Sequence, residues 1–96
     1  MDKTRKRVRV ENLTSSKGNK VANQLVIETS EGTYFQSYNS MIAFMPCSRN
    51  EKVQLDREKW NYSTMTGKYR NQFLLETKKE TEKKIKAGEY ELVDLN

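Results

Sequence analysis

Short stretches of alternating apolar and polar residues occupy the first half of the chain and predict β-strands. Residues 24–29 and 33–38 are rich in β-branched and aromatic side chains, and Ser30-Glu31-Gly32 between them is typical of a tight turn. These two segments are therefore expected to form a β-hairpin. The same pattern predicts further strands at residues 7–13, 52–56 and 90–95, and the short apolar run at residues 41–45 fits a buried strand.

A helical period replaces this alternation after residue 61. Met65, Tyr69 and Phe73 recur every four residues, which predicts a helix with one apolar face. Ser63 or Thr64 is suited to cap its start. Thr77-Lys78-Lys79-Glu80 matches a capping box, so a second helix starting at Thr77 is an alternative to one continuous helix.

These elements predict an α+β fold within a single domain, residues 1–96. We expect an antiparallel β-sheet of four to five strands packed against one or two C-terminal helices. Residues 1–6 form a separate basic arm, for which disorder is one of two alternatives; the other is that the arm continues into the first strand. The predicted contacts of the helices with the sheet are made by Tyr69, Phe73, Leu74 and Ile85.

The distribution of charge changes this picture of an ordinary small domain. The 96 residues carry a formal net charge of +5, and the first twenty residues alone account for this excess. Residues 68–86 form a second basic segment, which an acidic C-terminal tail balances in the total. Basic surfaces of this kind attract polyanions, and salt weakens the attraction. The candidate phosphate contacts are Arg5, Lys6, Arg7 and Arg9, followed by Lys78, Lys79, Lys83 and Lys84. A solvated helix face is the alternative explanation for the second group.

Aromatic residues are concentrated between residues 34 and 73, interspersed with amide, hydroxyl and basic side chains. Exposed aromatic rings beside basic residues can stack on unpaired bases or form the centre of a protein interface. The alternative is that these rings fill the edge of a small core with their polar ends in water. The candidate contact residues of this type are Tyr34, Tyr38, Trp60 and Tyr62.

Catalytic and metal-binding signatures are missing from the sequence. It contains no histidine and a single cysteine, Cys47, which removes histidine-based catalysis and cysteine zinc sites. Asp56 and Glu58 are close in sequence, but such a pair is typical of a solvated surface. We therefore expect no catalytic residue, no metal and no cofactor, and no enzymatic activity. The sequence also has neither an apolar span nor an export signal, which favours a cytoplasmic protein without a membrane contact.

Three segments carry a resemblance to a known group of proteins: EGTYFQSYNSMIAF, WNYSTMTGKYRNQFL and TEKKIKAGEYELVDLN. They resemble small, mostly uncharacterised proteins that bacteriophages and mobile elements of Gram-positive bacteria carry. The similarity covers about residues 23–96 and leaves out the N-terminal arm. The resemblance implies a phage accessory context, in which proteins of this size often bind DNA or disable a host defence. It assigns no functional residue.

Together these observations favour a small phage-type binding protein that contacts DNA, RNA or a host-defence nucleoprotein through its basic arm and basic helix. The alternative is a protein-directed inhibitor of a host defence system, such as an anti-CRISPR protein. A structural virion protein is a third class. The compartment would be the host cytoplasm if the chain is phage-encoded. The oligomeric state stays open, with a homodimer among the alternatives.

Overall fold

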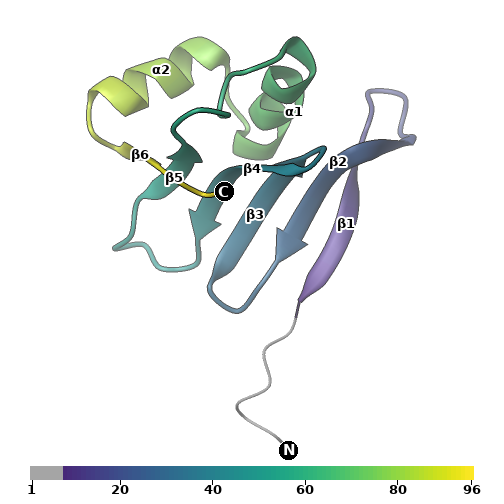
Figure 1. Cartoon of the computed structure of the whole chain (residues 1–96), viewed down its shortest axis with the longest axis horizontal. Coiled ribbons are helices and arrows are strands. Elements are labelled where there is room, and N and C mark those ends of the chain that lie inside the picture. The colour runs from purple at the N-terminus through teal and green to yellow at the C-terminus, as the bar shows by residue number, and fades with distance from the viewer. Residues whose placement is uncertain (1–7) are drawn as a thin grey trace, which may run out of the picture.

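The computed structural model describes residues 8–96, which form one six-stranded sheet with two helices on the same side of it (Figure 1). Arg5, Lys6 and Arg7, three of the predicted phosphate contacts, lie outside the described residues. The elements are β1 (Arg9–Thr14), β2 (Lys20–Glu28), β3 (Gly32–Ser37), β4 (Ser40–Pro46), β5 (Val53–Asp56), α1 (Thr64–Leu74), α2 (Lys78–Lys86) and β6 (Tyr90–Val93).

The strands lie in the sheet in the order in which they occur along the chain, from β1 at one edge to β6 at the other. The first five are antiparallel, whereas β6 pairs parallel to β5. The prediction of an α+β sheet with helices is confirmed, but the expectation of four to five antiparallel strands is wrong. β6 is parallel because the two helices between β5 and β6 carry the chain back to the end of the sheet at which β5 began.

The predicted hairpin of β2 and β3 is confirmed, with Val26 opposite Phe35 and Glu28 opposite Thr33. Its turn is held by the Thr29 hydroxyl, which accepts the backbone N–H of Gly32. A side chain at Gly32 would meet its neighbours on β4, because an added Cβ would lie 2.5 Å from the Met45 carbonyl oxygen and 2.7 Å from the Phe44 ring. The close approach of β3 and β4 therefore requires glycine at this position.

The core lies between the sheet and α1. Its fully buried sheet residues include Phe35 and Leu55, and α1 covers them with Tyr69 and Leu74. Phe73 and Ile85 pack against this cluster from the helices, so all four predicted helix contacts are confirmed. Met65 is 44% exposed, because the buried face of α1 begins one residue later, at Thr66.

The chain forms two helices, as the capping box indicates. The Ser63 hydroxyl accepts the N–H of Thr66 and caps α1. Thr77 and Glu80 exchange both hydrogen bonds of a capping box at the start of α2. Between the helices, Leu75 adopts the left-handed conformation with φ 57°, which ends α1 and turns the chain.

A buried carboxylate, Glu76, holds α2 and β6 together. One of its oxygens accepts hydrogen bonds from Lys84 of α2 at 2.7 Å and from Tyr90 of β6 at 2.8 Å. Its other oxygen accepts from the Thr81 hydroxyl. Its side chain is only 4% exposed. Burial alone would raise the pKa of Glu76, but these hydrogen bonds outweigh it and lower the pKa below its ordinary value.

Replacing Gly32 by alanine should destabilise the protein by about 1–3 kcal/mol, because the added methyl group overlaps the β4 backbone and the Phe44 ring. The matched control is Gly67→Ala in α1, where the nearest atom to an added Cβ is 3.7 Å away. That change should raise the free energy of unfolding by up to about 1 kcal/mol, since alanine is a better helix former than glycine. Urea unfolding measures the free energy of unfolding of both variants. An equal change in the two variants would contradict the close packing of Gly32 against β4.

Glu76→Gln should lower the free energy of unfolding by about 1–3 kcal/mol at pH 7, because the Lys84 ammonium loses its buried charged partner. The folded-state pKa of Glu76 is depressed, so its contribution is present above the unfolded-state value and is lost as the pH falls through the folded-state value. The difference from the unmodified protein should therefore shrink below about pH 4.

The exposed Glu82 provides the matched control for this pH dependence, since Glu82→Gln removes the same charge from α2 at a solvated position. Unfolding titrations at several pH values measure both variants. If the deficit of Glu76→Gln stayed constant from neutral to acid pH, the ionised carboxylate would not be the stabilising group.

Candidate functional site

The structure separates the predicted basic residues. Arg9 lies on β1, the first strand of the sheet, where it forms ion pairs with Glu11 and Glu28. The α2 helix packs against β6, the last strand of the sheet, so its lysines lie at the opposite edge from Arg9. Among the described residues, the strand that follows the basic arm and the basic helix therefore do not form one surface.

The four lysines predicted on α2 also differ from one another. Lys84 is bound to Glu76 and contacts the Tyr90 ring, so it belongs to the internal network of the fold. Lys78, Lys79 and Lys83 are exposed. Only these three, of the four predicted here, are free of an ion pair within residues 8–96 and are available to a ligand.

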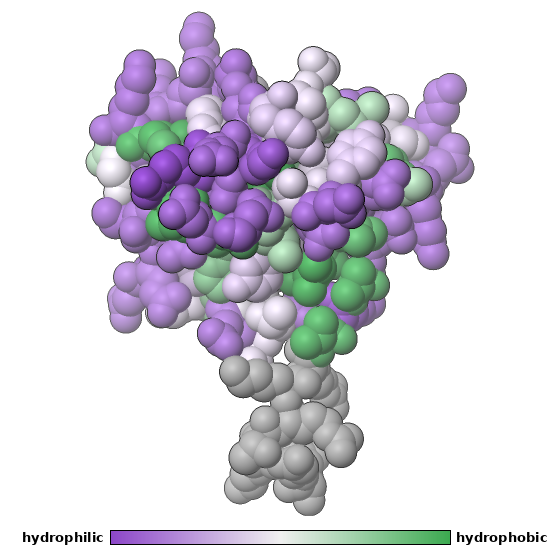
Figure 2. All heavy atoms as spheres, in the orientation of Figure 1, coloured by the Kyte–Doolittle hydropathy of each residue, from purple (hydrophilic) through white to green (hydrophobic). Residues whose placement is uncertain are grey.

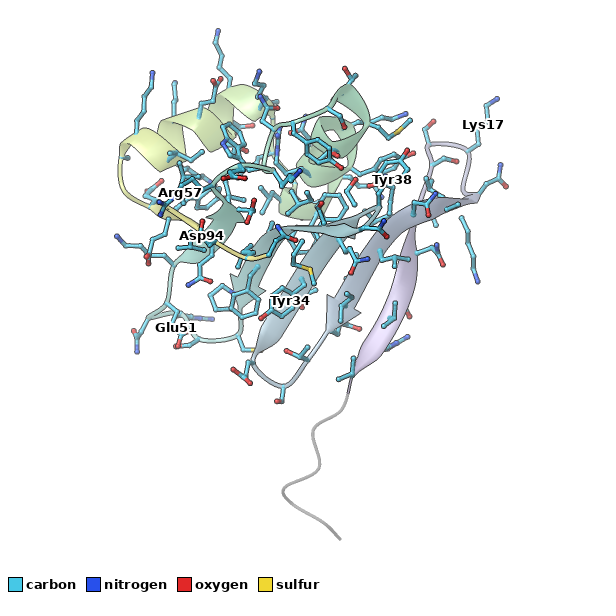
Figure 3. All side chains as sticks on the ribbon, in the orientation of Figure 1. Lys17, Tyr34, Tyr38, Glu51, Arg57 and Asp94 are labelled. Carbon is cyan, nitrogen blue, oxygen red and sulfur yellow. The ribbon has the colours of Figure 1, made fainter. Side chains whose placement is uncertain are left out.

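The predicted aromatic residues likewise fall into three places. Tyr34 is half-buried on the sheet face turned away from the helices, with its ring 4.5 Å from that of Phe44. Tyr38 follows β3 in a turn, with φ 56° and 47% exposure, and lies nearer to α1 in Figure 3. Trp60 and Tyr62 lie instead in the connection before α1. A stacking platform made of all four rings is therefore absent from the described structure.

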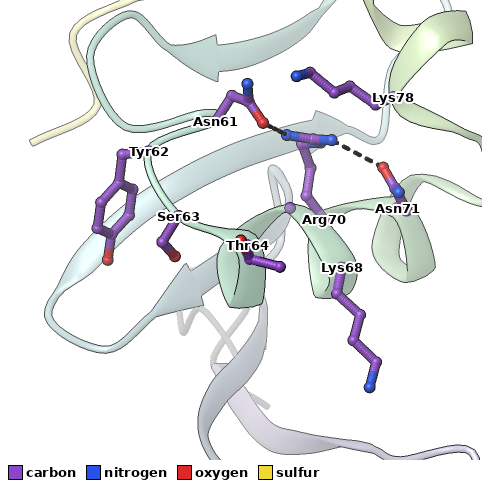
Figure 4. Close-up of a pocket in the computed structure, with 9 residues that line it drawn as sticks. Asn61, Tyr62, Ser63, Thr64, Lys68, Arg70, Asn71 and Lys78 are labelled. Carbon is purple, nitrogen blue, oxygen red and sulfur yellow. Dashed lines mark hydrogen bonds between the residues drawn. The ribbon is translucent and has the colours of Figure 1, made fainter.

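A concave site forms where this connection, α1 and the start of α2 meet (Figure 4). Its volume is about 640 Å³, and it is wide open to solvent. Two of the predicted residues, Tyr62 and Lys78, line it. Amide, hydroxyl and cationic side chains make up most of its wall, which consists of Asn61, Tyr62, Ser63, Thr64, Gly67, Lys68, Arg70, Asn71 and Lys78.

The floor of this site is the guanidinium group of Arg70, a residue only 1% exposed. Its Nη1 donates to the Trp60 carbonyl oxygen at 2.7 Å and to Asn61 Oδ1 at 3.1 Å. Its Nη2 donates to Asn71 Oδ1 at 2.9 Å, and the group lies 5.1 Å from the centre of the Trp60 ring. All of these acceptors are neutral. Nε has no hydrogen-bond partner.

Arg70 stays charged in this setting. Burial lowers the pKa of its guanidinium, and the more distant Glu76 and Glu82 oppose that shift. Because the ordinary pKa of a guanidinium lies far above 7, the group remains a cation at neutral pH. Within residues 8–96 no carboxylate forms an ion pair with it, which is unusual for a buried cation.

The surroundings of Arg70 add further positive potential. Lys78 extends toward Arg70 and Asn61 in Figure 4, so two cations point into the same space. The lining contains no acidic residue, and the first turn of α1, which also lines the site, has none. The positive end of the α1 dipole therefore acts in the same direction. The arrangement fits an anion with several oxygen acceptors, such as a phosphate group.

Sequence reasoning missed Lys68, Arg70, Asn61 and Asn71. A charged residue on a helix is typical of the solvated face, so its charge alone argues against burial of Arg70. One signal was present, since Arg70 directly follows Tyr69 of the predicted apolar stripe and so lies at its margin. Trp60 is positioned by its cation–π contact with Arg70 rather than by exposure to a ligand.

The acidic pair Asp56 and Glu58 lies at a second, smaller concavity of about 290 Å³. The two Asp56 oxygens accept backbone N–H groups of Leu95, Glu58 and Lys59, so this carboxylate closes the turn after β5. Within residues 8–96 no group of three or more histidine, cysteine or acidic residues is arranged to hold a metal ion. No helix of the described part is long and apolar enough to cross a membrane.

Comparison with known proteins gives one match. The model of a family of unknown function, DUF8033, matches residues 8–89. No curated protein and no solved structure matches the chain.

Replacing Arg70 by methionine should destabilise the protein by about 1–3 kcal/mol, because the Trp60 carbonyl and two asparagine side chains lose their donor. The matched control is Arg57→Met, because exposed Arg57 makes one side-chain hydrogen bond, to the Leu92 carbonyl. Its cost should stay below about 1 kcal/mol. Urea unfolding followed by Trp60 fluorescence measures both; an equal or larger loss in the Arg57 variant would refute the structural role of Arg70.

Proposed function

The chain belongs to the DUF8033 family of unknown function, and we propose that it binds a nucleic acid by the phosphate backbone. The observation that carries the proposal is the buried Arg70 guanidinium beside Lys78, in a concave site whose described walls hold no carboxylate. A nucleic acid supplies the missing negative charge at regular intervals, and phosphate contacts from arginine and lysine dominate its affinity for proteins.

The exposed face of α2 extends this site into a longer basic surface. Lys79 and Lys83 follow Lys78 along the helix, and lysine side chains project outward from α2 at the top of Figure 3. Successive helical turns rise about 5.4 Å, which is of the order of the spacing of phosphates along a strand. A nucleic-acid strand that places one phosphate over Arg70 and Lys78 can therefore place its following phosphates at the α2 lysines.

Aromatic side chains beside the site favour a single-stranded segment. Tyr62 is 44% exposed and lines the site, and the Lys59 ammonium lies 5.1 Å from the centre of its ring. An exposed ring next to a phosphate contact can stack on an unpaired base, a combination that many single-strand binding proteins use. Trp60 does not line the site but packs on the Arg70 guanidinium.

The wider role we propose is that of a non-enzymatic accessory protein of a bacteriophage or mobile element, acting in the host cytoplasm. This part of the proposal is supported by the sequence resemblance and by the small, basic composition of the chain. The bound partner is then DNA, RNA or a nucleoprotein of host defence.

The second candidate is a protein-directed inhibitor of a host defence system, such as an anti-CRISPR protein. It is favoured by exposed apolar side chains away from the basic site, among them Val8 and Val10, which are 64% and 54% exposed. Binding of that kind buries apolar surface and depends little on salt.

The proposal is tested by the salt dependence of binding to single-stranded DNA and RNA. Replacing Lys68 and Lys78 by glutamine should weaken binding at low salt and reduce the slope of log K against log salt by about 0.7 for each lost phosphate contact. The matched control replaces Lys17 and Lys52, which lie outside the lining of the site, by glutamine, and so removes the same charge.

The control pair should leave the slope within error of the unmodified protein. No binding of either nucleic acid at low salt would overturn the proposal, as would equal losses in the two double variants. Retention of a host protein after nuclease treatment of a lysate would favour the second candidate.

A further inference from the structure

The β1 edge of the sheet presents a strand with a self-complementary arrangement of side chains. β1 is the first strand in the sheet order, and in the described structure only β2 pairs with it (Figure 1). Val10 points to one face of the sheet, and its neighbours Arg9 and Glu11 point to the other. The unpaired backbone groups of such an edge are a template for another strand.

An apolar row leads across the open sheet face to this edge. Directly opposite residues in antiparallel strands share a face, so the register places Val10, Ile27, Tyr34 and Phe44 side by side on four neighbouring strands. This face is the one turned away from the helices, since the adjacent Phe35 and Ala43 belong to the core. In Figure 2, apolar residues form a green area directly above the grey segment, over β1 and β2.

We infer that the occupant of this edge is a second copy of the chain, paired antiparallel through β1 with Val10 opposite Val10 of the other copy. In that register Arg9 of each copy lies opposite Glu11 of the other, which makes two complementary cross-strand pairs. The present partners of Arg9 do not prevent this, because its ion pair with Glu11 is highly exposed, with 71% and 55% of the two side chains accessible.

The same register extends the apolar row. Two rows that each end in Val10 meet at the two-fold axis, so Val10 of each copy, more than half exposed in the monomer, is covered by the other. The regular pairing of β1 with β2 over residues 9–12 leaves this segment straight, and the irregularity follows only after Asn12. Charge and apolar complementarity thus select one register.

The pairing has a geometric consequence for the rest of the molecule. A two-fold axis perpendicular to the sheet makes one continuous sheet of twice the width, with the helices of both copies on the same side. The inference does not depend on the proposed function, because it uses neither the basic site nor α2.

The charge pattern supplies the first test, with sedimentation equilibrium across micromolar to millimolar concentrations. Arg9→Glu alone and Glu11→Arg alone put like charges opposite each other and should weaken the dimer at least about tenfold. An equimolar mixture of these two variants restores both complementary pairs and should form a heterodimer. Circular dichroism checks that each variant is folded.

A covalent trap supplies the second test, in a Cys47→Ser background because Cys47 is exposed and free. Val10→Cys places two thiols opposite each other within disulfide distance, and mild oxidation by air should form a covalent dimer, with oxygen taking up the electrons. Val8→Cys is the matched control. In the same register its thiol lies about 13 Å from its counterpart, so it should cross-link far less.

A protein that stays monomeric at all concentrations would overturn the inference. So would a dimer that tolerates both single charge reversals, a mixture that fails to associate, or equal cross-linking at residues 8 and 10. Dimerisation can fail while nucleic-acid binding persists, and the reverse also holds, so the two proposals are tested separately.

Discussion

The buried carboxylate of Glu76 fixes the relative positions of the two helices and the last strand. It stands between α1 and α2 and accepts hydrogen bonds from α2 through Lys84 and from β6 through Tyr90. Its hydrogen bonds offset the cost of burying a charge, and the geometry ties the start of α2 to the end of α1. Lys78, the first residue of α2, extends toward the Arg70 guanidinium from this junction. The cationic site is therefore a product of the helix junction.

Local signals explain which parts of the fold could be predicted. Alternation and one apolar run indicated the strand segments, although the predicted sheet had only four to five strands, and the capping box at Thr77 offered the second helix as an alternative that the structure confirms. Both patterns depend on neighbouring residues. The parallel pairing of β6 depends instead on how the two helices cross the sheet, which no local pattern records. Met65 shows the same limit at smaller scale: a period of four predicted its burial, whereas packing on the sheet selects Thr66 and Arg70.

The candidate site was only partly predictable for a related reason. Lys78 and Tyr62 were identified by charge and by aromatic character, and both line the site. Arg70 was not, because its significance comes from burial without a carboxylate partner, a property of tertiary structure. β1, the strand that follows the basic arm, and α2 lie at opposite edges of the sheet. Net charge predicts only a class of partner, and the fold determines which basic residues lie together.

The β1 edge and the helix side of this small sheet differ in chemistry. The β1 edge carries balanced charges and an apolar row, whereas the cationic site lies on the helix side, where α1, the connection before it and the start of α2 meet. Pairing through β1 would set two cationic sites on the helix side of one wide sheet. Once a flexible nucleic-acid strand is bound at one site, its free part is held at a high effective concentration near the second site. Two weak sites would then bind one strand more tightly than either site alone. Affinity for long strands would exceed that for short ones by more than the added phosphates explain.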